Sequence, residues 1–408
     1  MAKIHASNDG STMKAAFVTE WCAIGTVADK IKVGDVPAPP APKKAEVLIG
    51  VKAASISGDD VALLQDTFAG GSAHSHKPSE AKPLVGGMDY AGVVLACGPN
   101  CKRLKVGDRV VGIMKIYLGE GSQPGTWAEQ TKAPENEVCK IEDDSISFVN
   151  AAAVAMGAFV DSAMIKLAVK PLANGGRCLV IGASGALGTV MLQLLQKYKG
   201  HVTAVCSGKN ADKVRSLGAH EVVDYTTKPF GEQLASGDKF AVAFDFVGGK
   251  EVQSGAAPLL ERGGMYVTAV GRVHGLEMRT RKLPTGEFMS QVERRKASST
   301  PPAVELLKRA RCGGLTPPPH LFFVCSPRAL GYMIRSGCDC CGKYKWAMAQ
   351  PYPPLTAEVW KSAVLESGAR AAIAEEVPFA EAPIREAIKR AATHHAGGRL
   401  VLNLEKTS

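Results

Sequence analysis

The chain has 408 residues, 46% of them hydrophobic, and a formal net charge of +10. This length suits two domains, and the apolar content is enough for a large core. The longest apolar run, residues 151–160, stops at Asp161, so no stretch reaches the ~18 residues of a membrane span.

The N-terminus and the cysteines bear on the compartment. The first twelve residues are polar and contain no arginine, which predicts neither a secretory signal nor a mitochondrial presequence. The eleven cysteines are scattered and odd in number, which indicates reduced thiols in an intracellular protein. We therefore expect a cytoplasmic protein, with a mitochondrial location as the alternative.

Residues 13–150 contain short apolar runs separated by turn signals. Residues 47–51, 90–94 and 106–112 are examples, and they predict a mostly β domain. Cys97 and Cys101 lie in a strand-and-turn pattern where valine would also fit, so we expect both to be core residues.

The next feature is a glycine-rich turn. Residues 178–188 combine a short apolar run with Gly182, Gly185 and Gly188, and an apolar helical pattern follows at residues 189–198. Such a turn brings backbone N–H groups and a helix N-terminus to a pyrophosphate. We predict that the glycines hold a dinucleotide together with the four residues between them, Ala183, Ser184, Ala186 and Leu187. The alternative is a tight turn in another α/β fold.

Predicted strands and helices alternate along the sequence from this turn onward. We expect strands at residues 178–181, 201–206, 221–223, 240–246 and 265–270, and helices at residues 189–198, 212–217 and 251–260. This order predicts a parallel sheet with right-handed crossovers.

The end of the second strand predicts the type of dinucleotide. An acid about 20 residues past the glycines would bind the ribose of NAD, but Ser207 and Lys209 stand there, with Lys213 further on. A cation attracts the 2′-phosphate of NADP, and Tyr225 closes the next strand near the adenosine end. NADPH is therefore the expected cofactor. The alternative is that the two lysines only solvate a helix start.

Residues 272–342 are expected to be an insertion. Between residues 272 and 311, ten Lys or Arg stand against four Asp or Glu, and aromatics are scarce, which disfavours nucleic acid as a partner. We expect a solvated surface segment, with an acidic protein or an anionic membrane surface as an alternative partner. Cys338, Cys340 and Cys341 lack the paired spacing of a zinc site, so we expect no bound metal.

Several motifs resemble a known family. Residues 87–92, 182–188 and 245–249 resemble the zinc-free, zeta-crystallin-like quinone oxidoreductases of the medium-chain dehydrogenase/reductase superfamily. Residues 344–347 and 398–402 resemble its reticulon-interacting mitochondrial branch in particular.

The resemblance implies an α/β protein with two domains. A GroES-like, mostly β domain is expected at residues 13–150 with 354–408, and a Rossmann domain with a doubly wound parallel sheet at residues 151–353. The resemblance places four strand-end residues against the cofactor, Val247, Gly248, Val270 and Gly271. It places Ser57 and Asp60 in the nicotinamide pocket, although a purely structural role is the alternative for both.

The departures from the family limit the chemistry. Ser57 and Met88 stand where zinc-dependent members have a cysteine and a histidine, so no catalytic zinc is expected. Phe68 stands in place of the catalytic tyrosine of enoyl-thioester reductases, and Val160 in place of a threonine beside the nicotinamide.

The expected function is a zinc-independent, NADPH-dependent oxidoreductase that transfers hydride to quinones or related α,β-unsaturated carbonyls. Two alternatives remain, a nucleotide-binding pseudoenzyme that docks to a larger complex through the basic insertion, and an enoyl-thioester reductase. A homodimer is also possible for such a protein.

Overall fold

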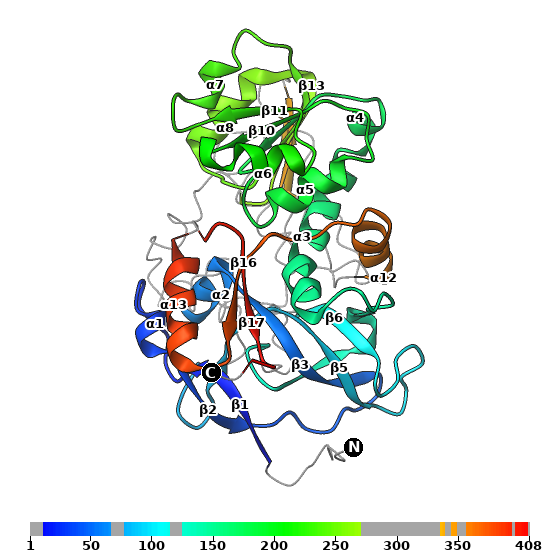
Figure 1. Cartoon of the computed structure of the whole chain (residues 1–408), viewed down its shortest axis with the longest axis vertical. Coiled ribbons are helices and arrows are strands. Elements are labelled where there is room, and N and C mark those ends of the chain that lie inside the picture. Colours follow the sequence, from blue (N-terminus) through cyan, green and yellow to red (C-terminus); the bar gives the residue numbers. More distant parts are fainter. Residues whose placement is uncertain are drawn as a thin grey trace, which may run out of the picture.

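The computed structural model forms two lobes joined by the long helix α3 (Phe148–Leu167), which runs from the lower lobe into the upper one (Figure 1). It describes residues 11–66, 77–114, 125–270, 335–338, 344–348, 356–393 and 396–406.

The lower lobe is mostly β. Its strands are β1 (Thr12–Val18), β2 (Lys32–Pro37), β3 (Glu46–Ile56), β4 (Leu84–Val85), β5 (Asp89–Cys97), β6 (Arg109–Ile113), β7 (Gln130–Pro134), β8 (Val138–Lys140), β16 (Ile373–Pro378) and β17 (Arg399–Asn403). The larger sheet has the order β16-β17-β3-β5-β6-β8, and β7 also pairs with β3. The smaller sheet has the order β2-β1-β4. The last strand, β17, therefore lies beside β3 in a sheet whose other strands, β16 apart, come from residues 46–140.

The helical segments of the lower lobe pack around its strands, and two of them, α12 and η5, contact α3. These helical segments are α1 (Val27–Lys30), α2 (Gly58–Leu64), η2 (Glu135–Glu137), α12 (Ala357–Trp360), the π-helix η5 (Lys361–Glu366) and α13 (Glu381–Ala392). In α13, Ile384, Ala387, Ile388 and Ala391 are buried. Their spacing of three and four residues places them on one helix face, which packs on the core.

The upper lobe is a doubly wound sheet. Its strands are β9 (Cys178–Ile181), β10 (Val202–Cys206), β11 (Glu221–Asp224), β12 (Phe240–Asp245), β13 (Leu260–Thr268), β14 (Arg335–Cys338) and β15 (Tyr344–Met348). Its helices are α4 (Val169–Ala173), α5 (Gly188–Leu195), η3 (Gly208–Asn210), α6 (Ala211–Ser216), α7 (Phe230–Gln233), α8 (Lys250–Ala256) and η4 (Ala257–Leu259). The sheet order is β11-β10-β9-β12-β13-β15-β14, parallel except for β14. All six residues of β12 are buried, as expected for a strand covered on both faces.

The predicted fold class is confirmed, with local differences. The strand expected at residues 265–270 begins earlier, at Leu260, and is in irregular register with β12. The helix expected at residues 251–260 ends sooner because Pro258 lies in a following 3₁₀ turn. The strand β14 falls within the range expected for the insertion and pairs with β15. That part of the range therefore contributes an edge strand to the sheet.

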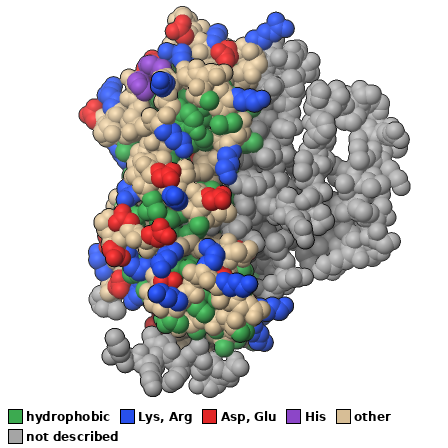
Figure 2. All heavy atoms as spheres, turned by 90° about the vertical axis from the view of Figure 1, so that its right-hand side faces the viewer, with side chains coloured by type: hydrophobic (Ala, Val, Ile, Leu, Met, Phe, Trp, Pro, Cys, Tyr) green, Lys and Arg blue, Asp and Glu red, His purple; other side chains and the backbone are tan. Residues whose placement is uncertain are grey.

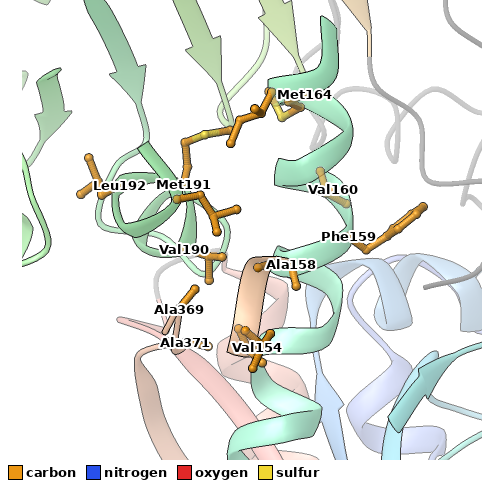
Figure 3. Close-up of a cluster of buried hydrophobic side chains, with 14 of the residues drawn as sticks. Val154, Ala158, Phe159, Val160, Met164, Val190, Met191, Leu192, Ala369 and Ala371 are labelled. Atoms are coloured by element: carbon orange, nitrogen blue, oxygen red, sulfur yellow. The ribbon is translucent and has the colours of Figure 1, made fainter. Parts of the chain in front are cut away.

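Helix α3 is packed into the core rather than against solvent. Figure 3 shows Val154, Ala158 and Met164 of α3 beside Val190 and Met191 of α5. A Cβ atom on Gly157 would lie 2.9 Å from Val190 Cγ2, so glycine permits the close approach of these two helices. By length and composition α3 resembles a membrane span, but 72% of its most apolar window is buried inside the protein. Packing therefore explains its apolar character.

The surface in Figure 2 carries charges of both signs. Lys and Arg side chains alternate there with Asp and Glu, and small hydrophobic groups lie between them. The basic residues between 272 and 311 lie outside the described residues. On this face, the described part of the chain therefore forms no large region of one charge.

Candidate cofactor and substrate site

The predicted pyrophosphate turn joins β9 to α5. Gly182 has a φ of +81°, which strongly favours glycine, and its N–H donates to Val205 O at 3.1 Å. A Cβ on Gly188 would lie 2.3 Å from Gly182 O, so helix and turn are in close contact. A Cβ on Gly185 would meet only Gly182 O, at 3.3 Å. The three glycines thus provide a tight turn, an open approach and close helix packing, which is the division of roles that a dinucleotide turn needs.

The start of α5 suits an anion. Leu187 at its N-cap offers no side-chain acceptor to the first N–H groups of the helix. The N–H of Thr189 donates to Gly185 O and those of Val190 and Met191 donate to Leu187 O, so the N–H groups that can meet a phosphate are those of the turn just before them. The positive end of the helix dipole favours an anion at the same place. The residues present therefore fit a dinucleotide.

Asn210 connects this turn to the end of β10. Its Nδ2 donates to Ser207 Oγ at 2.9 Å and to Ser184 Oγ at 3.3 Å. Two predicted site residues from separate loops are thereby held together. The sequence analysis missed Asn210, because an asparagine after a strand also indicates an ordinary turn.

The place predicted for the adenosine phosphate contains both a positively and a negatively charged side chain. Lys209 is exposed and Tyr225 is half exposed, while Ser207 is partly buried. Asp224 ends β11, and a Cβ on Gly208 would lie 2.4 Å from its Oδ2. Hydrogen bonds, first from Thr226, hold the pKa of Asp224 below its usual range. A carboxylate from the neighbouring strand thus lies next to the position predicted for the 2′-phosphate, a feature that the sequence analysis missed.

Asp245 organises the next loop. Its carboxylate is fully buried and accepts hydrogen bonds from Val247 N and Gly248 N, both at 2.9 Å. The hydroxyls of Tyr266 and Thr268 also donate to it, at 2.7 and 2.9 Å. The paired strands β12 and β13 therefore fix the loop predicted to face the cofactor.

The end of β13 is tied to the same network. Val270 N donates to Thr268 Oγ1 at 3.1 Å. Gly271, the last residue of this predicted group, lies outside the described residues. The motif of residues 245–249 indicated this loop in the sequence, but only the structure identifies the Asp245 carboxylate as the centre of its hydrogen bonds.

Ser57 and Asp60 form a pair at the start of α2. Ser57 N and Oγ donate to Asp60 Oδ2 at 2.7 and 2.6 Å, and Asp60 N donates to Ser57 Oγ at 3.3 Å. This is a capping box, which is the structural alternative raised by the sequence. Burial, followed by the charge of Asp89, raises the pKa of Asp60 to about 7. A carboxyl group with such a pKa exchanges protons near neutral pH.

A second acid lies close to this pair. Asp89 is buried and accepts from Ser55 N at 2.7 Å and from Ser55 Oγ at 2.5 Å. Arg399 Nη2 lies 3.4 Å from Asp89 Oδ2, and Arg399 Nε donates to Ala153 O of α3 at 3.3 Å. The strand β17 therefore brings a cation close to Asp89 and Asp60, and a backbone carbonyl of α3 accepts one of its hydrogen bonds. The sequence analysis missed Arg399 in this role because almost the whole chain separates it from Asp89.

The side chains at this place do not suit zinc. Ser57 uses its hydroxyl in the capping box, and Met88 is a buried thioether. Across the residues that the structure describes, no group of three His, Cys, Asp or Glu is arranged to hold a metal ion. Cys338 lies in β14, whereas Cys340, Cys341 and Phe68 lie outside the described ranges.

Hydrogen bonds join the two lobes at several points. Lys213 Nζ donates to Gly397 O at 3.0 Å, and Gln193 exchanges two hydrogen bonds with the backbone of Arg370, at 2.7 and 2.9 Å. The residues predicted for the adenosine phosphate and those predicted for the nicotinamide pocket belong to different lobes. These contacts fix the two groups relative to each other.

A half-open pocket with an apolar floor and a charged rim lies away from the glycine turn. It has a volume of about 260 Å³ and lies between α3, α5 and α12, lined by Ile165, Leu194 and Val359 among others. It contacts the C-terminal half of α5, whereas the predicted pyrophosphate site is at the N-terminus of this helix. The pocket is therefore separate from the predicted site.

Comparisons with known proteins agree with this architecture. Residues 43–143 match the alcohol dehydrogenase GroES-like domain, and residues 217–320 match the zinc-binding dehydrogenase family. A mouse protein named NAD(P)H oxidoreductase RTN4IP1, mitochondrial, is 35% identical over 238 residues, which is 55% of this chain and 58% of that protein. A tomato 2-methylene-furan-3-one reductase is 31% identical over 286 residues, which is 69% of this chain and 68% of that protein.

A solved structure shows the same fold over nearly the full length. The quinone oxidoreductase from Coxiella burnetii has a TM-score of 0.66 and 19% sequence identity, and the match covers 97% of this chain and 100% of that one.

Proposed function

Because the chain belongs to the medium-chain dehydrogenase/reductase superfamily of nicotinamide-dependent oxidoreductases, we propose that it reduces quinones or related α,β-unsaturated carbonyls with NADPH. The names of its relatives support this substrate class, since they describe an NAD(P)H oxidoreductase, a furanone reductase and a quinone oxidoreductase. The observation that carries the proposal is the open Gly185 position in a turn that Gly182 and Gly188 otherwise close.

The upper lobe would hold the cofactor through the residues already described. Gly182, Gly185 and the start of α5 would bind the pyrophosphate, while Ser207, Lys209 and Tyr225 would bind the adenosine phosphate. Lys209 supports NADPH, whereas the carboxylate of Asp224 beside it favours a ribose hydroxyl. We favour NADPH because the exposed ammonium of Lys209 attracts a 2′-phosphate, whereas Asp224 Oδ1 already accepts hydrogen bonds from Thr226 N and Oγ1 and is not free to bind a ribose hydroxyl.

The choice of acceptor follows from the side chains of the pocket. Bound NADPH supplies a hydride, and a simple ketone would then need a Lewis acid for its alkoxide. Ser57 and Met88 supply neither a thiolate nor an imidazole for such a metal. In a quinone or an enone, the negative charge is delocalised after hydride addition, so a positioned proton donor is sufficient.

We assign this proton donor to Ser57 and Asp60. The Ser57 hydroxyl is partly exposed and donates to Asp60 Oδ2, which is buried. Ser57 would transfer its proton to the oxygen of the reduced acceptor, and protonated Asp60 would return a proton to Ser57. In this arrangement the same hydrogen bonds both cap α2 and lead a proton to the pocket.

The experiment measures NADPH oxidation with a panel of quinones and enones, together with NADPH affinity. The key variant is Gly185→Ala, because its added methyl group would meet only one protein atom, Gly182 O at 3.3 Å, and a shift of the turn by a few tenths of an ångström relieves this tight contact without unfolding the lobe. We expect a wild-type melting temperature and at least tenfold weaker NADPH binding. Gly237→Ala is the matched control, since a Cβ there lies 3.6 Å from Leu234 O in an ordinary contact.

Three outcomes would change the proposal. Wild-type NADPH affinity in Gly185→Ala would mean that the pyrophosphate does not lie at this turn. Tight NADPH binding with no turnover of any acceptor would favour the scaffold alternative. Turnover of enoyl thioesters alone would favour the reductase alternative.

The compartment is part of the proposal. The name of the mouse relative places that protein in mitochondria. We therefore favour the mitochondrial alternative over the cytoplasmic location that the sequence analysis put first.

A further inference from the structure

Two cysteines differ from the other described thiols. Cys97 is the last residue of β5, and Cys101 follows a turn of three residues. Both side chains are partly exposed. The other cysteines whose side chains the structure describes are buried, namely Cys22, Cys139, Cys178 and Cys206. A reagent in solution should therefore reach Cys97 and Cys101 before these four.

The turn brings the two sulfur atoms together. Cys101 N donates to Gly98 O at 3.1 Å, and Gly98 N donates to Glu46 O at 2.8 Å, which anchors the turn on β3. The Cys101 thiol donates to Glu46 O at 3.1 Å and also lies within hydrogen-bonding reach of the Cys97 sulfur. The Cys97 thiol donates to Leu104 O at 3.5 Å. Both sulfurs are thus in one small volume at the edge of the core.

We propose that Cys97 and Cys101 are a modification site that closes reversibly into a disulfide when it meets a low-molecular-weight disulfide such as oxidised glutathione. This inference is independent of the proposed function. It requires no other partner, because the turn already presents one thiol to the other.

The reaction takes place in two exchange steps. The Cys101 thiolate attacks one sulfur of oxidised glutathione, and one glutathione thiolate leaves. The Cys97 thiolate then attacks Cys101 in the mixed disulfide, and the second glutathione leaves. Two protein thiols are oxidised, and one glutathione disulfide is reduced to two thiols.

The order of attack follows from the surroundings. Burial and the neighbouring Cys101 raise the pKa of the Cys97 thiol, so Cys97 is the poorer first nucleophile. Lys102 follows Cys101 directly and is exposed, so its positive charge attracts the anionic glutathione, whereas the Arg103 guanidinium donates to Glu135 O and Val138 O. The alternative is a purely structural role. Both side chains pack against the core of the lower lobe, where a cysteine can serve as a small apolar residue.

The test uses the full chain in buffers of oxidised and reduced glutathione. No Lys or Arg lies between the two cysteines, so they share one tryptic peptide. We expect this peptide to lose two hydrogens in mass after oxidation and to regain them with dithiothreitol. The peptide that contains buried Cys139 should keep its free thiol in the same sample. Cys97→Val should instead retain a glutathione adduct on Cys101, and valine suits the packing at this position.

Two results would overturn the proposal. The first is a wild-type protein whose Cys101 keeps the glutathione adduct without losing two hydrogens. The second is equal labelling of Cys97, Cys101 and Cys139, which would mean that the pair has no special access or geometry. If Cys97→Val fails to fold, Cys101→Val replaces it. In that variant Cys97 should take up less glutathione than Cys101 does in wild type before the disulfide closes, and an equally fast adduct on Cys97 would contradict the order of attack.

Discussion

Asp161 of α3 should destabilise the protein at neutral pH. Its side chain is fully buried, and neither carboxylate oxygen has a hydrogen-bond partner. Burial raises its pKa well above the usual range, and Arg399 offsets this only in part. A buried polar group without a partner costs about 1–3 kcal/mol. We therefore expect Asp161→Ala to raise the free energy of unfolding by at least about 1–2 kcal/mol at pH 7 from the missing hydrogen bonds alone, after a small cavity cost.

The pH dependence gives a sharper test. Below the pKa of the unfolded state, both states hold the proton, and the raised pKa of Asp161 costs nothing. Above it, the unfolded state releases the proton while the folded state still holds it, so stability falls as pH rises. The advantage of Asp161→Ala should therefore widen between pH 5 and pH 7, by at most about 1.4 kcal/mol per pH unit.

Urea denaturation at pH 5, 6 and 7 measures this difference. Asp238→Ala is the control, because its side chain is 85% exposed and its stability effect should stay within about 0.5 kcal/mol. A destabilised Asp161→Ala protein with the same deficit at every pH would refute the reasoning, since it would mean that the carboxylate is stabilised by a partner.

Three further predictions concern catalysis and binding. Lys209→Glu should weaken NADPH binding by about tenfold to a hundredfold and leave NADH binding unchanged, because one charge-assisted phosphate contact is worth about 1.5–3 kcal/mol; equal NADPH affinity by titration would contradict the assignment. In the wild type, kcat should fall as pH rises through about 7, the pKa of Asp60, and Asp60→Asn should lose this step with about 10²-fold lower kcat; an unchanged pH profile would exclude the proton-donor role. Turnover should survive EDTA, since Ser57 and Met88 are not zinc ligands, and activity lost with EDTA and restored by zinc would be the opposite result.

The fold was largely predictable because its signals are local. The run of residues 178–188 contains its own strand, turn and helix start, and the later elements repeat the two periodicities. Errors arose where a boundary depends on tertiary contacts. The strand β13 begins at Leu260 because it pairs with β12, and β14 forms because β15 offers an edge. The sequence pattern of β13 or β14 alone does not show which strand it pairs with.

The site was only partly predictable for the same reason. The glycine turn and the residues after β10 were found because each is a continuous motif. Asp224 and Arg399 act across strands, and the pair of Arg399 with Asp89 joins opposite ends of the chain. Asp161 was read only as the end of an apolar run, because its lack of a hydrogen-bond partner is a property of the packed structure.

The position of β17 affects how the protein is made. It pairs with both β3 and β16, although the entire upper lobe lies between β3 and β17 in sequence. Domains usually fold in order as they emerge from the ribosome. Here the mostly β lower lobe emerges first but cannot complete its larger sheet until β17 emerges. The strands of the upper lobe all precede β17 in the sequence. β7 already pairs with residues 46–50 of β3, so the part of β3 that waits for β17 is residues 53–56. This part is exposed throughout most of synthesis, and a chain that stops before β17 would retain an open, apolar stretch of sheet edge that invites aggregation.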